Sequence, residues 1–196
     1  GESSAGTAFT KAGAGALVLG AAVAYTGSTT VSAGSLILNG GTSTLYSSAG
    51  VLAQGGVLDL GGVTQYTQGM IQVNGGMVQN GTLFLGSLLD LVSGTVDAVL
   101  AGATNLSKNG ALQLALTGAN TYSGMTTIYG GTLQLGDATA LGTGSLVMQG
   151  GSLNAVIGNT TLSSNTAQYW NDNFTFLGTG NLNLGLGAVT LNATRT

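Results

Sequence analysis

The chain has 196 residues, of which only 5% are charged and 36 are glycine, and it contains no proline, cysteine or histidine. The absence of cysteine excludes a disulfide framework and a thiolate metal site, and the absence of proline excludes collagen. A net charge of −3, with Lys11, Lys108 and Arg195 as the only cations, leaves too few basic side chains to neutralise phosphates. We therefore do not expect nucleic acid as a partner.

The first predicted element is a thirty-residue segment that occurs twice. Residues 11–40 read KAGAGALVLGAAVAYTGSTTVSAGSLILNG, and residues 108–137 read KNGALQLALTGANTYSGMTTIYGGTLQLGD. The two copies align without a gap at a constant offset of 97 residues. A chain that repeats itself in this way is typical of a solenoid. Its longest predominantly apolar stretch, residues 12–25, is shorter than the roughly 20 residues that span a bilayer, so we expect no direct membrane insertion.

A shorter pattern recurs along the whole chain: a glycine, a small or polar residue, and then apolar residues at alternate positions. This period of two predicts short strands with one buried face. The residue between two apolar ones, such as Asp59, is expected to face solvent. No window shows helical periodicity, so the sequence predicts an all-β protein. The clearest members are GALVL (15–19), GSLIL (34–38), GVLDL (56–60), GTLFL (81–85), GALQL (110–114), GTLQL (131–135), GSLVM (144–148), GNLNL (180–184) and GAVTL (187–191).

The spacing of these segments bears on how the strands pair. Asn-Gly pairs at 39–40, 74–75, 80–81 and 109–110 favour antiparallel hairpins. The glycine-led strands, however, recur every 16 to 22 residues or so, which is typical of one turn of a parallel β-helix. We predict such a coil, with about nine or ten turns stacked at about 4.8 Å to form a rod about 45 Å long. Low charge fits it, because stacked like charges would repel each other.

The last part of the chain, residues 155–196, departs from the pattern and contains the single tryptophan. Tyr169 and Trp170, followed by Phe174 and Phe176, could form an aromatic platform for a sugar. The alternative is that Trp170, Phe174 and Phe176 fill the interior of the coil, as most aromatic side chains do. The sequence leaves both interpretations open.

Acidic residues are the only candidates for catalysis or metal binding. The six are Glu2, Asp59, Asp90, Asp97, Asp137 and Asp172. Polysaccharide-cleaving β-helices need clustered acids for calcium or for acid–base chemistry. The closest pair here, Asp90 and Asp97, need not share a face, Asp59 is expected to point outward, and Asp137 is expected in a turn. We therefore predict no catalytic residue, no metal ligand and no cofactor.

The second copy resembles the autotransporter-associated, or passenger-associated, β-strand repeat over residues 116–153. The first copy departs from that pattern at Val23, where the repeat has an asparagine. The tail over residues 167–191 is similar to a segment that often follows this repeat in large bacterial surface proteins. The matching positions in the second copy are Gly118, Asn120, Tyr122, Gly124, Thr126, Thr127, Gly131, Leu133 and Leu135.

The resemblance implies a right-handed parallel β-helix in an extracellular passenger, which is often displayed through an outer-membrane β-barrel. It implies structural roles for the motif, with glycine at corners, leucine inward, and asparagine and threonine in ladders. Residues 1–196 are then expected to be a single β-helix fragment of a longer passenger with flanking repeats. The barrel is expected outside this sequence.

Three functions follow from these expectations. The first is a non-enzymatic structural or adhesive rod on a bacterial surface, with a surface glycan or a host or matrix protein as partner. The second is a carbohydrate-binding module that uses Tyr169 and Trp170, together with Tyr122 and Tyr129. The third is a β-helix polysaccharide lyase or hydrolase, for which Asp90 and Asp97 are the only candidates.

Overall fold

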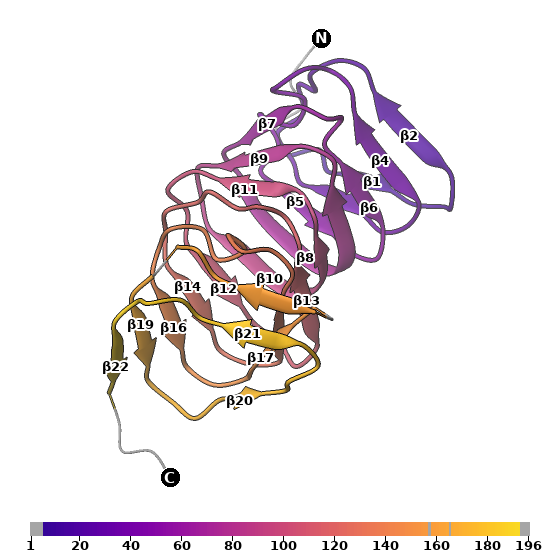
Figure 1. Ribbon diagram of the computed structural model, residues 1–196. Helices are drawn as coiled ribbons and strands as arrows, with labels where there is room; N and C mark the ends of the chain where they lie inside the picture. Colours follow the sequence, from indigo (N-terminus) through magenta and orange to yellow (C-terminus); the bar gives the residue numbers. More distant parts are fainter. Residues whose placement is uncertain (1–5, 157, 165, 193–196) are drawn as a thin grey trace.

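Alternating apolar residues and glycine corners coil the chain into a parallel β-solenoid of about nine turns (Figure 1). The computed structural model describes residues 6–156, 158–164 and 166–192. The regular elements of this described part are all β-strands, and it contains no helix long and apolar enough to cross a membrane. β1 (Phe9–Lys11) and β2 (Ala16–Leu19) lie at one end of the coil, and β22 (Val189–Leu191) lies at the other (Figure 1). The all-β, parallel β-helix prediction is confirmed.

Each turn contributes strands to two long stacks, which two continuous strands join. β8 (Met70–Gln79) and β10 (Leu89–Val96) each bend from the first stack into the second. The first stack also contains β1, β3 (Thr29–Val31), β5 (Gly50–Ala53), β12 (Leu106–Lys108), β14 (Thr126–Ile128), β16 (Leu146–Met148), β19 (Gln168–Trp170) and β22. The second also contains β2, β4 (Ser35–Leu38), β6 (Val57–Asp59), β13 (Gln113–Leu116), β15 (Thr132–Leu135), β17 (Ser152–Ala155) and β20 (Thr175–Phe176).

A third face of the coil is more irregular and carries two short parallel sheets. Turns and loops replace strands elsewhere on this face. One sheet contains β7 (Thr64–Thr67), β9 (Thr82–Leu85) and β11 (Val99–Ala101), and the other contains β18 (Asn159–Thr161) and β21 (Asn181–Asn183).

All strand pairings among the described residues are parallel, so the hairpin alternative is wrong. The Asn74-Gly75 pair illustrates the reason. It lies inside β8, where Gly75 takes a φ of +83° and turns the strand from one stack to the next. Ladder partners lie from 17 residues apart, as for Leu89 and Leu106, to 23 residues apart, as for Ser152 and Thr175. The predicted repeat length is confirmed.

The core is built from columns of inward side chains. Leu36, Leu58, Val78 and Val96 are successive ladder partners in the second stack, and each is at most 1% exposed. The glycine-led pattern predicts that Leu112, in residues 110–114, faces inward. This prediction is wrong, because Leu112 is 66% exposed. There the ladder with β15 fixes the register, so the inward residues of β13 are Leu114 and Leu116. The alignment of the two copies predicts that register correctly.

Candidate functional site

In the second repeat copy, Asn120 ties three turns of the coil together. Its buried side chain accepts a hydrogen bond from the Leu100 amide at 2.8 Å and donates one to the Ala140 carbonyl at 2.7 Å. These partners lie in the turns before and after its own. Because all three groups are buried, each would otherwise lack a partner. The geometry gives Asn120 a structural contact.

Tyr122 lies inside the coil and cannot contact a sugar. Its side chain is 0% exposed, and its hydroxyl lies 2.6 Å from the Thr126 hydroxyl. Burial raises the pKa of the Tyr122 hydroxyl, and the hydrogen bond with Thr126 offsets only part of that effect. The suggestion that Tyr122 binds carbohydrate is therefore wrong, because the turns on either side cover it. Tyr129, in contrast, is 56% exposed.

The remaining motif residues occupy positions where packing leaves no freedom. A Cβ atom on Gly124 would lie 1.9 Å from the Thr104 carbonyl oxygen, so only glycine lets these two turns stack. Gly131 takes a φ of +65° at the corner before β15. Leu133 and Leu135 are 0% exposed in the core, and Thr127 is also buried, at 6% exposed.

The side chains of Lys11 and Lys108, which in the sequence are simply two of the few cations, are buried in the coil. The Lys11 ammonium donates to the carbonyls of Ala12, Gly13 and Ala33 at 3.2, 2.7 and 3.0 Å. The Lys108 ammonium makes the same three bonds one repeat later, to Asn109, Gly110 and Gly130, at 2.6, 3.1 and 3.1 Å. Lys11 is 6% exposed and Lys108 is 0% exposed. Desolvation lowers the pKa of Lys108, and the charge of Asp90 partly opposes that effect. Their identical placement in both copies was the signal that could have revealed this role.

The acidic residues are dispersed and hold structural hydrogen bonds. Asp90 accepts from Gln72 and Asn109, both at 2.7 Å, whereas Asp97, beyond the end of β10, accepts from Thr117 at 2.7 Å. Asp90 belongs to the first stack and Asp97 follows the second, so the pair does not share a strand face. Residues 6–156, 158–164 and 166–192 contain no group of three acids that could hold a metal ion. Glu2 and Arg195 lie outside the described residues.

Asp59 and Asp137 lie where the sequence predicts them. Asp59 is half-buried on the outer side of β6. Burial raises its pKa, but hydrogen bonds from the Gly61 amide and from the Gln79 and Asn80 side chains outweigh this and leave the pKa below its usual value. Asp137 accepts two bonds from Thr139, both at 2.7 Å, and so closes a turn.

The two C-terminal aromatic residues face opposite sides of β19. Tyr169 lies in the outward column and is 37% exposed. Trp170 aligns with buried Met148 and packs against the core, with its ring centroid 5.0 Å from that of Phe174 in an edge-to-face contact. Phe176 is 46% exposed. Of the proposed sugar platform, Tyr169 and Phe176 are therefore exposed, whereas Trp170 and Phe174 pack against the core.

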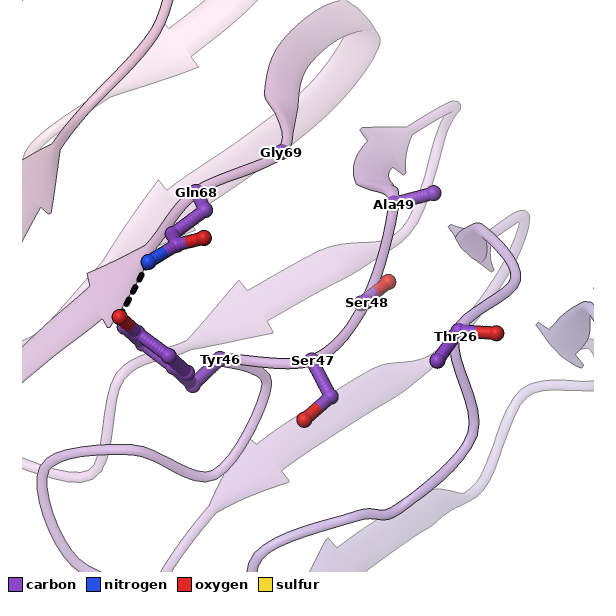
Figure 2. Close-up of a pocket in the computed structure, with 7 residues that line it drawn as sticks. All are labelled: Thr26, Tyr46, Ser47, Ser48, Ala49, Gln68 and Gly69. Atoms are coloured by element: carbon purple, nitrogen blue, oxygen red, sulfur yellow. Dashed lines mark hydrogen bonds between the residues drawn. The ribbon is translucent and has the colours of Figure 1, made fainter. Parts of the chain in front are cut away.

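A groove that the sequence did not reveal lies at the corner between the third face and the first stack. Its hollow of about 400 Å³ is open to solvent. The lining comes from three neighbouring segments of the coil, and Figure 2 shows the Tyr46 hydroxyl meeting the side-chain amide of Gln68. Seven residues line it: Thr26, Tyr46, Ser47, Ser48, Ala49, Gln68 and Gly69.

Exposed aromatic side chains continue beside this groove. Tyr46 is 44% exposed, and Tyr66 and Phe84 are each 42% exposed. Tyr66 lies two residues before Gln68 and is the ladder partner of Phe84, with their ring centroids 5.2 Å apart. The aromatic strip formed by Tyr46, Tyr66 and Phe84 is not part of the repeat motif. No periodicity in the sequence predicts it.

The comparisons with known proteins agree with the repeat architecture. The model of the passenger-associated-transport-repeat matches at residues 9–38 and again at residues 106–135. Half of the chain, over 110 residues, is 39% identical to a protein named adhesin BmaC autotransporter from Brucella suis biovar 1 (strain 1330). The chain spans only 3% of that adhesin's length. No solved structure matches the chain. The resemblance to the passenger-associated repeat is therefore confirmed.

Proposed function

Because the chain carries two passenger-associated-transport-repeats on a parallel solenoid, we propose that it is a non-enzymatic, adhesive rod segment of a passenger on a bacterial surface. The observation that carries this proposal is that the polar side chains of the repeat copies form hydrogen bonds within the coil. The polar groups of Asn120, Tyr122 and Lys108 all bond between or within turns and do not face a ligand. What remains for recognition is the outer surface of the coil, as in other repeat proteins.

Stacking gives this segment a mechanical role that suits display outside a cell. Each turn contacts only its neighbours, so a turn can fold onto the previous one as the chain emerges. Backbone hydrogen bonds between turns then hold the rod without disulfides, which this cysteine-free chain cannot form. The proposed partners are a surface glycan or a host or matrix protein. The similarity to an adhesin supports this class of partner.

The proposal is tested on intact bacteria that produce the complete protein, with and without residues 9–192. An antibody against this segment should label intact cells, and cells lacking the segment should be retained less well on immobilised glycans or matrix proteins under flow. A matched control deletes an equal length from another part of the same protein. Labelling that requires permeabilised cells would contradict surface display. Unchanged retention would contradict the adhesive role.

A polysaccharide-cleaving activity is the competing function. It requires acids that act together, and Asp90 and Asp97 are each held by neutral side chains on different stacks. We expect no release of reducing ends from a panel of polysaccharides. Cleavage that is lost in an Asp90→Asn, Asp97→Asn double variant would overturn the non-enzymatic proposal.

A further inference from the structure

The groove beside Tyr46 carries an inference that deepens the adhesive role and rests on it. We propose that this groove binds an uncharged saccharide, with the Tyr46 ring against the sugar and the Gln68 amide, the Ser47 hydroxyl and the Thr26 hydroxyl as its hydrogen-bonding groups. Its hollow of about 400 Å³ lies within the range of small-molecule sites, about 300–1,000 Å³. It is open on one side, as binding to a glycan chain requires.

The polar groups of the groove are free to bond with a ligand. Gln68 donates from its side-chain nitrogen to the Tyr46 hydroxyl, which leaves the hydroxyl proton of Tyr46 and the amide oxygen of Gln68 available. Ser47 is exposed, and its hydroxyl makes no hydrogen bond within the described part of the chain. Thr26 accepts from the Gly6 amide at 3.1 Å and keeps a proton to donate. Donors and acceptors thus lie side by side, which suits the hydroxyl groups of a sugar.

The charge of the groove selects the chemical class of the ligand. None of the seven lining residues is charged. The two described lysines cannot help to bind an anion, because both ammonium groups are held by three carbonyls inside the coil. A phosphate or carboxylate ligand would therefore lose water without gaining a cation. A cationic ligand would find no carboxylate in the lining. A neutral molecule with hydroxyl groups and an apolar C–H face fits both constraints.

The aromatic ring supplies the apolar part of the contact. Tyr46 is held at one end by Gln68, so its exposed ring is pre-positioned and loses little freedom on binding. Ser48, two residues after Tyr46, is buried, and its hydroxyl proton is shared between the carbonyls of Gly27 and Gly50, at 3.0 and 2.9 Å. Those bonds fix the backbone that carries Tyr46 and Ser47. The turn is therefore rigid beneath a polar, aromatic surface.

A second hollow extends the groove and indicates the length of the ligand. It measures about 250 Å³, shares Ala49 with the first, and includes the uncharged side chains of Thr30, Met70 and Gln72. Because the two hollows share Ala49, and because Met70 of the second follows Gly69 of the first, they adjoin along the strand direction of the same turns. We expect an oligosaccharide to span both hollows and to bind more tightly than a single sugar.

The second repeat copy provides an internal contrast. Both copies are followed by a six-residue turn, at residues 42–47 and 138–143. In these turns Leu45 corresponds to Leu141, and both are buried. The next residue is Tyr46 in the first turn but Gly142 in the second, where a Cβ atom would lie 2.2 Å from the Tyr122 carbonyl oxygen. No aromatic ring fits there, so the described chain should bind one saccharide at these two turns.

The test uses the full chain and uncharged tetrasaccharides of glucose, galactose and mannose, with binding followed by calorimetry and by ligand-observed NMR. We expect at least one tetrasaccharide to bind, and Tyr46→Ala to weaken it about tenfold or more. Tyr46→Phe, which keeps the ring, should weaken it less, and Gln68→Ala should weaken it about threefold to tenfold. Tyr129→Ala and Tyr169→Ala, at exposed tyrosines outside the groove, are the matched controls and should bind as the unchanged chain does.

Several results would overturn the inference. They are the absence of saccharide binding at millimolar concentration, unchanged affinity in Tyr46→Ala with its fold intact by circular dichroism, or loss of binding only in Tyr169→Ala. Tighter binding of a sulfated tetrasaccharide, or of an unstructured peptide, would also overturn the proposed ligand class. If bacteria carrying Tyr46→Ala still adhere, this inference fails while the adhesive role stands. If the purified chain binds sugar through Tyr46 but is not displayed on cells, the proposed function fails instead.

Discussion

The two repeat copies share their motif residues but have different surroundings. β13 of the second copy lies between β10 and β15, whereas β2 of the first has β4 as its only described ladder neighbour. Tyr122 is accordingly 0% exposed, whereas its counterpart Tyr25 is only half-buried. The lysine bonds are nevertheless the same in both copies. The repeat sequence thus determines the hydrogen bonds of the corner lysine, whereas the neighbouring turns determine how deeply a side chain is buried.

The largest expected effect separates glycines that touch a neighbouring turn from those that do not. Gly124→Ala should destabilise the fold by about 4 kcal/mol, because its Cβ would overlap the Thr104 carbonyl oxygen. Gly27→Ala, with a Cβ 2.1 Å from the Thr7 carbonyl oxygen, should have a comparable cost, because the overlap is nearly as close. Gly20→Ala, whose Cβ would meet nothing within 4 Å, is the control. Urea unfolding measures all three, and equal costs in Gly124→Ala and Gly20→Ala would refute the steric argument.

The internal lysines give the next largest effect. Lys108→Met should cost about 3 kcal/mol, because it leaves the three carbonyls that surround the buried ammonium without this donor. Lys11→Met should cost somewhat less, since Lys11 keeps slight exposure to water. The free energy of unfolding of each variant is the measurement. A Lys108→Met variant as stable as the parent would show that water or chain relaxation satisfies those carbonyls.

Exchanging the asparagine between copies sharpens the comparison further. Asn120→Val should cost about 2 kcal/mol, because the Leu100 amide and the Ala140 carbonyl lose their partner. The reverse change, Val23→Asn, should alter stability by no more than about 0.5 kcal/mol. The Thr44 carbonyl, at the turn position that Ala140 occupies in the second copy, already accepts a hydrogen bond from the Val23 amide at 3.0 Å. An asparagine side chain at position 23 therefore gains little. Thermal unfolding of the two variants checks the difference. Equal and opposite effects would show that the motif asparagine acts independently of its position in the stack.

The smallest expected effect depends on pH. Burial raises the pKa of Tyr122 above its ordinary value of about 10 in the folded state only. The resulting stabilisation is complete below pH 10 and is lost as pH rises above 10, because the unfolded chain then releases the proton first. Tyr122→Phe should cost about 1 kcal/mol at neutral pH by leaving the Thr126 hydroxyl unpaired, and should make unfolding less sensitive to pH above 10.

Tyr25→Phe is the matched control for this pH dependence. The pKa of Tyr25 is also raised by burial, but its partner Thr29 has a second hydrogen bond, with Ser48 at 3.1 Å. We therefore expect a smaller loss of stability at neutral pH. Urea unfolding at several pH values between 7 and 11 or so compares the two variants. Identical pH profiles for Tyr122→Phe and the parent chain would exclude Tyr122 as the titrating group.

The sequence by itself determined the architecture of this protein. Glycine corners, alternating leucines and a repeat at an offset of 97 residues were sufficient to predict a parallel β-solenoid, its turn length, and the inward positions of Leu133 and Leu135. These features are local and recur along the coil, so the same pattern predicts the same strand and corner in successive turns. The predicted turn at Asp137 followed from equally local chemistry.

Only the tertiary structure decided which side chains reach the surface. Tyr122 lies inside because the neighbouring turns cover it, although its position in the sequence also allowed a contact with a ligand. The groove depends on Thr26, Tyr46 and Gln68, which are about one turn apart in sequence and become neighbours through stacking. The physical reason is that periodicity assigns a side chain to one face of a strand. The lateral contacts between turns, which no local pattern encodes, decide what that face meets.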